Sequence, residues 1–135
     1  TMLNLVNNAR ASGRQCGNRG WYAATTPLTW DCKLRNAATV HSRDMANNNF
    51  FDHTGSNGLS VSNRVTAAGY NWRTVGENIA AGYANENSVM NGWLGSAGHC
   101  VNIMNPNYRH FGSSVVFTNQ ANYSSYWTQV FAAPR

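Results

Sequence analysis

The order of the sequence patterns predicts an α+β fold in which helices lie against an antiparallel sheet. Helical spacing of apolar residues dominates the first half of the chain, and a short apolar segment bounded by Gly76 and Gly82 follows. Two further strand-like segments near the end are separated by an Asn/Gln/Ser-rich turn. Separate runs of helices and strands are typical of domains whose helices cover one sheet, rather than of alternating parallel βα units.

Five segments are expected to be helical or to form a helical turn. In the segment 31–48, apolar side chains recur every three or four residues, and Asp31 can cap its first turn. Asn105-Pro106 is expected to end the last segment, because a residue before proline avoids the helical conformation. The predicted helical segments are 1–11, 31–48, 60–68, 86–96 and 100–104.

Three segments are expected to be strands. The residues 77–82 form a short apolar strand, which the irregular segment 70–76 precedes. Residues 111–117 and 126–132 read as two strands joined by an Asn/Gln/Ser-rich hairpin. No internal repeat or linker divides these elements.

Length and composition indicate one folded domain spanning residues 1–135. Hydrophobic residues make up 42% and aromatic residues 12% of the chain, which excludes the disordered class. Charged residues make up only 11%, well below the usual share of about 25%. Amide and hydroxyl side chains supply the polarity instead, a composition more typical of secreted proteins than of cytosolic ones.

The charge pattern argues against nucleic-acid binding. The formal net charge is +5, but the basic residues are scattered singly and form no patch-like run. We expect only a weak attraction to anionic cell-surface polymers. No apolar run approaches the roughly 20 residues that a membrane-spanning helix needs, and no signal peptide is recognisable. Because the chain opens directly on a helix, we expect that upstream residues, including any leader, are missing.

Glu77 is the residue around which a functional site is predicted. The chain has only two glutamates, and Glu77 lies in an apolar segment where an unpaired carboxylate would be costly. His53 and His99 are the candidate partners. The sequence therefore predicts a cleft in which His53, Glu77 and His99 meet.

Eight short motifs resemble, in order, those of the CAP superfamily, which groups cysteine-rich secretory proteins, antigen 5 and the plant pathogenesis-related group-one proteins. The likeness covers nearly the whole chain and is greatest to short bacterial extracellular members with an SCP domain. The motifs lie at 28–31, 41–46, 50–53, 68–70, 76–80, 89–99, 102–106 and 126–131.

The resemblance implies an α-β-α sandwich with a central antiparallel sheet of about three to four strands and a cleft that holds two histidines and two acidic residues. His53 and His99 match the two histidines, which in several members bind zinc or another divalent cation. Glu77 matches the first acidic residue. Ser96 occupies the position of the second, so the acidic pair is incomplete and Ser96 becomes a further lining residue of the cleft.

Three interpretations of the function follow as hypotheses. The first is a secreted, monomeric CAP domain whose cleft binds a divalent metal through His53 and His99, together with a small ligand, lipid or peptide, without catalysis. The alternative is a hydrolase that uses the same cleft, either metal-assisted or with Glu77, Ser96 and His99 as a triad. The sequence contains no GxSxG motif to support the serine version. A structural or adhesive module of a larger surface protein is the third interpretation.

Three cysteines allow one disulfide. The resemblance favours a bond between Cys16 and Cys100, and the alternative pairs Cys16 with Cys32. Two other histidines are expected to lie outside the site. His41 is predicted to be a hydrogen-bonded core residue, and His110 is predicted to lie on the surface.

Overall fold

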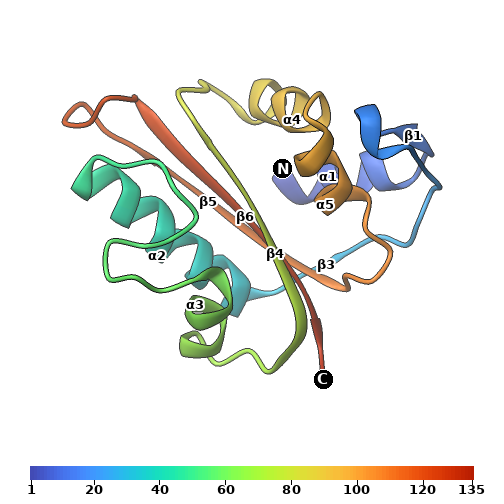
Figure 1. Ribbon diagram of the computed structural model, residues 1–135, viewed down its shortest axis with the longest axis horizontal. Coiled ribbons are helices and arrows are strands. Elements are labelled where there is room, and N and C mark those ends of the chain that lie inside the picture. The colour runs from blue at the N-terminus through green and yellow to red at the C-terminus, as the bar shows by residue number, and fades with distance from the viewer.

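A four-stranded sheet with the strand order β3-β5-β6-β4 forms the centre of the fold (Figure 1). The computed structural model describes all 135 residues. Strands β4, β5 and β6 pair antiparallel, as predicted, whereas the two-residue strand β3 runs parallel to β5. The bounds are β3 Thr29–Trp30, β4 Trp72–Ala81, β5 His110–Phe117 and β6 Ser125–Pro134.

The prediction that residues 70–76 are irregular is wrong over most of that segment. Strand β4 already begins at Trp72 and pairs with β6 through a register shift between Trp72 and Thr74. The alternation of Tyr70, Asn71, Trp72 and Arg73 does not continue through Thr74, Val75 and Gly76, and the register shift falls at this break, so the sequence pattern alone does not identify a strand. The pairing with β6 supplies the order that local preference lacks.

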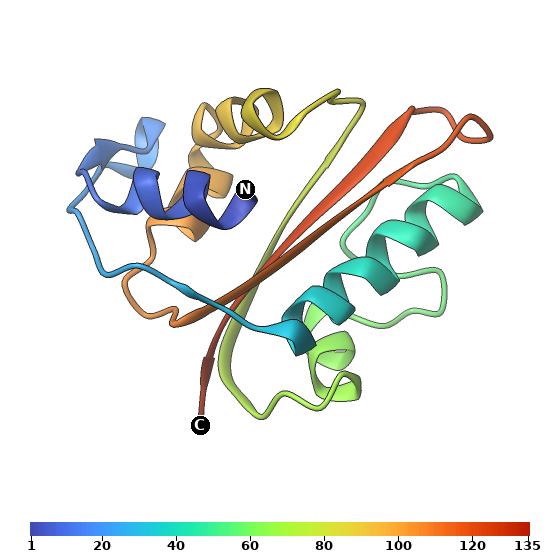
Figure 2. The same ribbon diagram turned by 180° about the vertical axis from the view of Figure 1, so that it is seen from behind.

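Helices cover both faces of the sheet, which confirms the α-β-α sandwich (Figures 1 and 2). Two helices pack on one face, namely α2 (Cys32–Asn48) and α3 (Val61–Ala67). The other layer holds α1 (Met2–Arg10), α4 (Glu86–Leu94) and α5 (Ala97–Met104). Between α1 and β3 lie the short elements β1 (Arg14–Gln15), η1 (Gly17–Arg19) and β2 (Trp21–Tyr22).

Local capping explains where the helices of the first layer begin and end. Oδ1 of Asp31 accepts hydrogen bonds from the backbone N–H groups of Lys33 and Leu34, as expected for a cap of α2. Ser60 and Asn63 form a reciprocal capping box at the start of α3. At the other end of α2, Asn49 takes a left-handed conformation with φ of 51° and stops the helix.

Strand β6 is buried on both faces and holds the two layers together. Toward α2 and α3, Val130 and Ala132 pack with Leu34. Toward the other layer, Trp127 and Phe131 pack with a larger cluster that includes residues of α1, α4 and α5. The approach of β5 to α2 is so close that a Cβ atom on Gly112 would overlap the helix backbone.

A disulfide bond joins Cys16 to Cys100, as the resemblance implied. Both cysteines are fully buried, and the bond ties the segment after α1 to helix α5. Cys32 is a free, exposed thiol, so the alternative pairing of Cys16 with Cys32 is excluded.

Candidate functional site

Strand β4 directs two neighbouring polar side chains to opposite faces of the sheet. Glu77 contacts residues of α2 and α3, and Asn78 contacts α5. Both are buried, with Glu77 6% exposed and Asn78 fully covered. Because β4 is the last strand of the sheet order, one of its edges is not paired with another strand.

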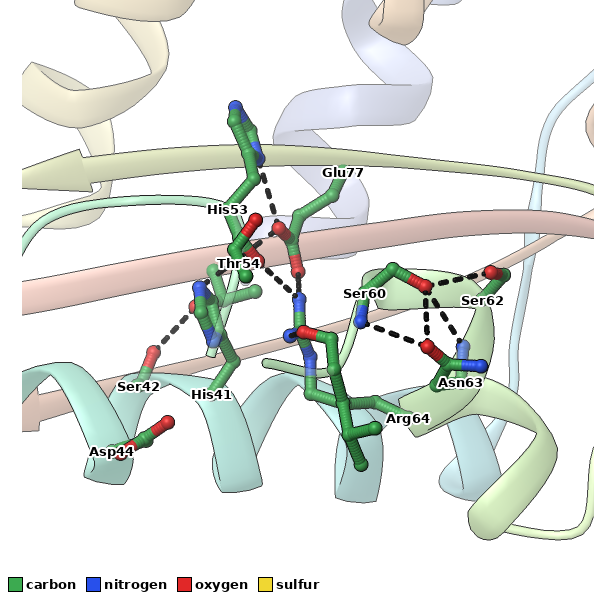
Figure 3. Close-up of polar contacts among 12 residues, drawn as sticks. His41, Ser42, Asp44, His53, Thr54, Ser60, Ser62, Asn63, Arg64 and Glu77 are labelled. Atoms are coloured by element: carbon green, nitrogen blue, oxygen red, sulfur yellow. Dashed lines mark hydrogen bonds and ion pairs between the residues drawn. The ribbon is translucent and has the colours of Figure 1, made fainter. Parts of the chain in front are cut away.

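The carboxylate of Glu77 has a separate partner at each oxygen (Figure 3). Oε2 accepts a hydrogen bond from Nη2 of Arg64 at 2.6 Å, and Oε1 accepts one from Nδ1 of His53 at 2.9 Å. The Arg64 side chain is only 5% exposed. This buried ion pair is the compensation that an isolated carboxylate in an apolar strand requires.

Arg64 also fixes the loop that carries His53. Its Nη2 donates to the carbonyl of His53 at 3.2 Å, and its Nη1 donates to the carbonyl of Leu59 at 3.1 Å. The same guanidinium therefore holds Glu77 and the backbone of its histidine partner. Sequence reasoning missed Arg64, since nothing in its local charge pattern separates it from the other arginines.

His41 is a core residue, as predicted. It is fully buried on α2, and its Nε2 donates to the carbonyl of Asp52 at 2.7 Å. This bond supports the corner that leads to His53, and Nε2 also lies 4.0 Å from Oε1 of Glu77. Burial lowers the pKa of His41 despite the opposing effect of the Glu77 charge, so the imidazole is neutral.

His53 is held at one nitrogen and free at the other. The hydrogen bond to Glu77 raises its pKa above the usual value. Its side chain is 56% exposed, and the ring extends past β4 on the side away from α2 (Figure 3). In the neutral form, Nδ1–H donates to Glu77 and Nε2 keeps its lone pair.

On the other face of β4, an amide network anchors the start of α5. Nδ2 of Asn78 donates to the backbone carbonyl of His99 at 3.2 Å and to Oε1 of Gln129 at 3.1 Å. Nδ2 of Asn102 donates in turn to Oδ1 of Asn78 at 2.9 Å and to the carbonyl of Glu77 at 3.2 Å. The network fixes His99 relative to the strand that carries Glu77.

The side chain of His99 pairs with Ser96. Its Nδ1 lies 2.8 Å from Oγ of Ser96, and no carboxylate bonds to the ring. Burial lowers the pKa of His99, and the charge of nearby His53 lowers it further. His53 and His99 thus have opposite pKa shifts, His53 upward and His99 downward.

A pocket of about 290 Å³ adjoins His99 and Ser96. Its walls include Ile79 and Trp93, which are buried, and three aromatic rings at its mouth. The rings of Phe51 and Tyr123 are each 48% exposed, with centroids 6.4 Å apart, and Tyr83 is the third aromatic residue. The pocket combines an apolar interior with the imidazole and hydroxyl of one helix start.

The structure therefore brings the predicted residues together in two pairs, His53 with Glu77 and Ser96 with His99. Both oxygens of Glu77 are used by His53 and Arg64, so the carboxylate does not orient His99. No group of three or more His, Cys, Asp or Glu side chains is arranged to hold a metal ion. His110, expected at the surface, is half-buried and bonds to the Tyr70 hydroxyl at 2.6 Å.

The three-layer sandwich matches the fold of a solved SCP-domain structure. The chain belongs to the cysteine-rich secretory protein family, CAP, whose model matches residues 3–131.

Relatives with known sequences or structures agree with this membership. The chain is 37% identical over 105 residues to the uncharacterized protein YkwD of Bacillus subtilis, which covers 78% of this chain and 39% of YkwD. An extracellular protein with an SCP domain from Bacillus anthracis superimposes with a TM-score of 0.78 at 27% identity, over 97% of this chain and 38% of that protein. An outer surface protein of Borrelia burgdorferi shares the fold, with a TM-score of 0.74 at 22% identity over 82% of this chain and 80% of that protein.

The chain thus spans well under half the length of YkwD and of the Bacillus anthracis protein. None of its helices has the length and apolar character needed to cross a membrane.

Proposed function

We propose that this chain is an extracellular CAP domain that binds a divalent cation, zinc in particular, through His53 and His99, and a small ligand in the adjoining pocket. One observation carries the proposal. Each histidine is hydrogen-bonded at Nδ1, to Glu77 or to Ser96, which leaves Nε2 of each ring as the available ligand atom. Metal-binding histidines are usually held in this way by a partner on the other ring nitrogen.

The donor set fits an open and weak zinc site. Zinc accepts neutral imidazole nitrogen, and two protein ligands leave the remaining positions of a tetrahedral ion to water or to a bound molecule. Glu77 would act behind His53, since its carboxylate accepts the Nδ1 proton and increases the basicity of the ring. The ion would supply a positive charge for a ligand group, and no catalysis is assumed.

The pocket indicates the chemistry of that ligand. Its apolar lining between Ile79 and Trp93 suits an aliphatic or aromatic group, and the exposed rings of Phe51 and Tyr123 extend the apolar surface at the mouth. A polar group on the same molecule could then reach His99 and a bound cation. A lipid with a polar head or a peptide with an apolar side chain has this composition.

Secretion is supported by three features. The buried disulfide between Cys16 and Cys100 is stable in oxidising compartments, and the low charged fraction is typical of secreted domains. The Bacillus anthracis protein similar to this chain is described as extracellular.

The hydrolase alternative rests on the Ser96–His99 hydrogen bond of 2.8 Å. A serine nucleophile also needs a group that orients its histidine, and the nearest candidate from the sequence, Glu77, is committed to His53 and Arg64. Esterase activity that disappears in Ser96→Ala would favour this alternative over ligand binding.

The deciding experiment is a calorimetric titration of the apo protein with zinc at pH 7.5. We expect saturable binding, with the heat lost in His53→Ala and in His99→Ala. His110→Gln is the matched control, because it removes a histidine outside the cleft and should leave binding unchanged. Binding should also stabilise the folded state by mass action, by about 2.7 kcal/mol at a zinc concentration 100 times the Kd, and so raise the melting temperature. Equal binding in all four proteins would refute the assignment of the site.

A further inference from the structure

Arg10 is a fully buried cation without an acidic partner. Its Nε donates to the carbonyl of Thr26 at 2.8 Å, and its Nη1 donates to the carbonyls of Ile103 and Asn105 at 2.8 and 2.9 Å. Nη2 is buried and has no hydrogen-bond partner. All ion pairs of the structure involve Glu77, so the charge of Arg10 is balanced by carbonyl dipoles alone.

A second arginine adds to the uncompensated charge. Arg109 is exposed, and its Nη1 donates to the carbonyls of Pro106 and Tyr108 at 2.8 and 3.1 Å. The remaining nitrogens of its guanidinium make no hydrogen bond within the chain. Burial and the charge of Arg109 together lower the pKa of Arg10 to about 10. The two guanidinium groups therefore repel each other, and an anion between or beside them would relieve that repulsion.

Arg109 lies in a polar groove of about 640 Å³, the Arg109 groove, whose lining includes Thr25, Thr26, Thr29, Pro106, Arg109 and His110. These residues come mainly from two walls, the extended segment that leads to β3 and the turn before β5, whose backbones lie near each other in Figure 2. The backbone N–H of Thr29 donates to the carbonyl of Arg109 at 3.0 Å and holds the walls together. No carboxylate side chain lines the groove.

His110 gives the groove a further donor. The Tyr70 hydroxyl lies 2.6 Å from Nδ1 of His110 and makes no other hydrogen bond. Burial keeps this hydroxyl protonated by raising the pKa of Tyr70 to about 12. When this hydroxyl donates to Nδ1, the imidazole carries its own proton on Nε2. Three threonine hydroxyls and the Arg109 guanidinium complete a set of donors from both walls.

We propose that the Arg109 groove binds phosphate groups, carried either by an anionic polymer or by the free anion. Two positive charges, one exposed and one buried behind it, suit an anion that carries more than one negative charge. A tetrahedral oxyanion presents its oxygens in different directions and can accept hydrogen bonds from donors on both walls. The groove is lined by other residues than the cleft of His53 and His99, so this binding does not depend on zinc.

The test is a titration with polyphosphate and with inorganic phosphate, followed by backbone amide NMR and calorimetry. We expect both probes to shift the amide signals of Thr25, Thr29 and His110. Replacing Arg109 by methionine should weaken polyphosphate binding about tenfold or more, since it removes a charge-assisted hydrogen bond. Arg43→Met is the matched control, because it removes an exposed arginine of α2, and it should change the Kd less than twofold.

Each outcome bears on the proposal. Equal weakening by Arg43→Met would show that only the net charge attracts the polymer and would overturn the site. Polyglutamate binding as tightly as polyphosphate would overturn the assignment to phosphate. Tighter binding of polyphosphate than of inorganic phosphate would identify a polymer as the source, whereas equal affinity per phosphate would identify the free anion. Both variants change exposed side chains, and unchanged melting temperatures will confirm that they fold.

Discussion

Replacing Arg64 by methionine should destabilise the protein far more than any change at the exposed part of the cleft. The Arg64 and Glu77 side chains are 5% and 2% exposed, so water does not weaken their 2.6 Å ion pair. Breaking a buried ion pair from one side leaves an uncompensated charge and typically costs about 3–5 kcal/mol. Arg64 also donates to two loop carbonyls, so the loop that carries His53 loses its support as well.

His53 gives the contrasting variant. It bonds to the same carboxylate at 2.9 Å, but its side chain is 56% exposed, so the interaction is weakened by solvent. Exposed ion pairs contribute roughly 0–1 kcal/mol, and His53→Ala should therefore cost no more than about 1 kcal/mol. The two partners of one carboxylate are thus expected to differ several-fold in their effect on stability.

Equilibrium unfolding in urea measures both effects. We expect the unfolding free energy of Arg64→Met to fall by about 3–5 kcal/mol, and the double variant Arg64→Met/Glu77→Gln to recover part of the loss because no charge is left unpaired. A loss below about 1 kcal/mol in Arg64→Met would refute the reasoning. So would a double variant whose loss equals the sum of the two single losses.

Three further predictions concern the frame around the cleft. The bond between Cys16 and Cys100 closes a loop with a sequence separation of 84. The unfolding free energy of the Cys16→Ser/Cys100→Ser variant, measured in urea, should therefore be lower by roughly 4.5 kcal/mol. An unchanged free energy would contradict this chain-entropy estimate. Gly112→Ala should prevent stable folding, because its Cβ would overlap the backbone of α2, whereas Gly98→Ala has open space and should be neutral or slightly stabilising in a thermal melt. Because burial lowers the pKa of His41, the unfolded chain binds a proton there more readily than the folded chain, and the stability of the protein should fall as the pH drops below about 6.5. His41→Gln should make the unfolding free energy depend less on pH between 7.5 and 5. An unchanged pH dependence would show that other groups cause the fall.

Most of the fold could be predicted because its elements follow local rules. The helix 31–48 has a regular apolar face and a capping aspartate, and the structure places α2 at Cys32–Asn48. Segment 70–76 obeys no such rule, because the start of β4 is ordered by pairing with β6 rather than by its own pattern. The same limit applies to β3, whose two residues become a strand only through β5.

The site was predictable where chemistry demanded a partner. A glutamate in an apolar strand needs compensation, and that requirement pointed to His53. The strongest partner is nevertheless Arg64, and a signal for it exists in the sequence. Arg64 lies next to Val65 on a short helix and three residues after Val61, so helical spacing turns it toward the packed side of α3. The link between Asn78 and Asn102 gives no comparable signal, since neutral amides occur in every part of this chain.

The two pairs, His53 with Glu77 and Ser96 with His99, differ in their electrostatics. Glu77 is bound first to Arg64 in the protein interior, and its second oxygen raises the pKa of His53, whereas burial keeps His99 neutral. A cation entering the proposed site would therefore compete with a proton more strongly at His53 than at His99. Arg64 holds both the Glu77 carboxylate and the loop that carries His53. We therefore expect the position of the exposed His53 ring to depend on this buried ion pair, which lies on the face of β4 opposite to His99. For the same reason, we expect Arg64→Met to weaken zinc binding at the proposed site as well as to lower the stability of the protein.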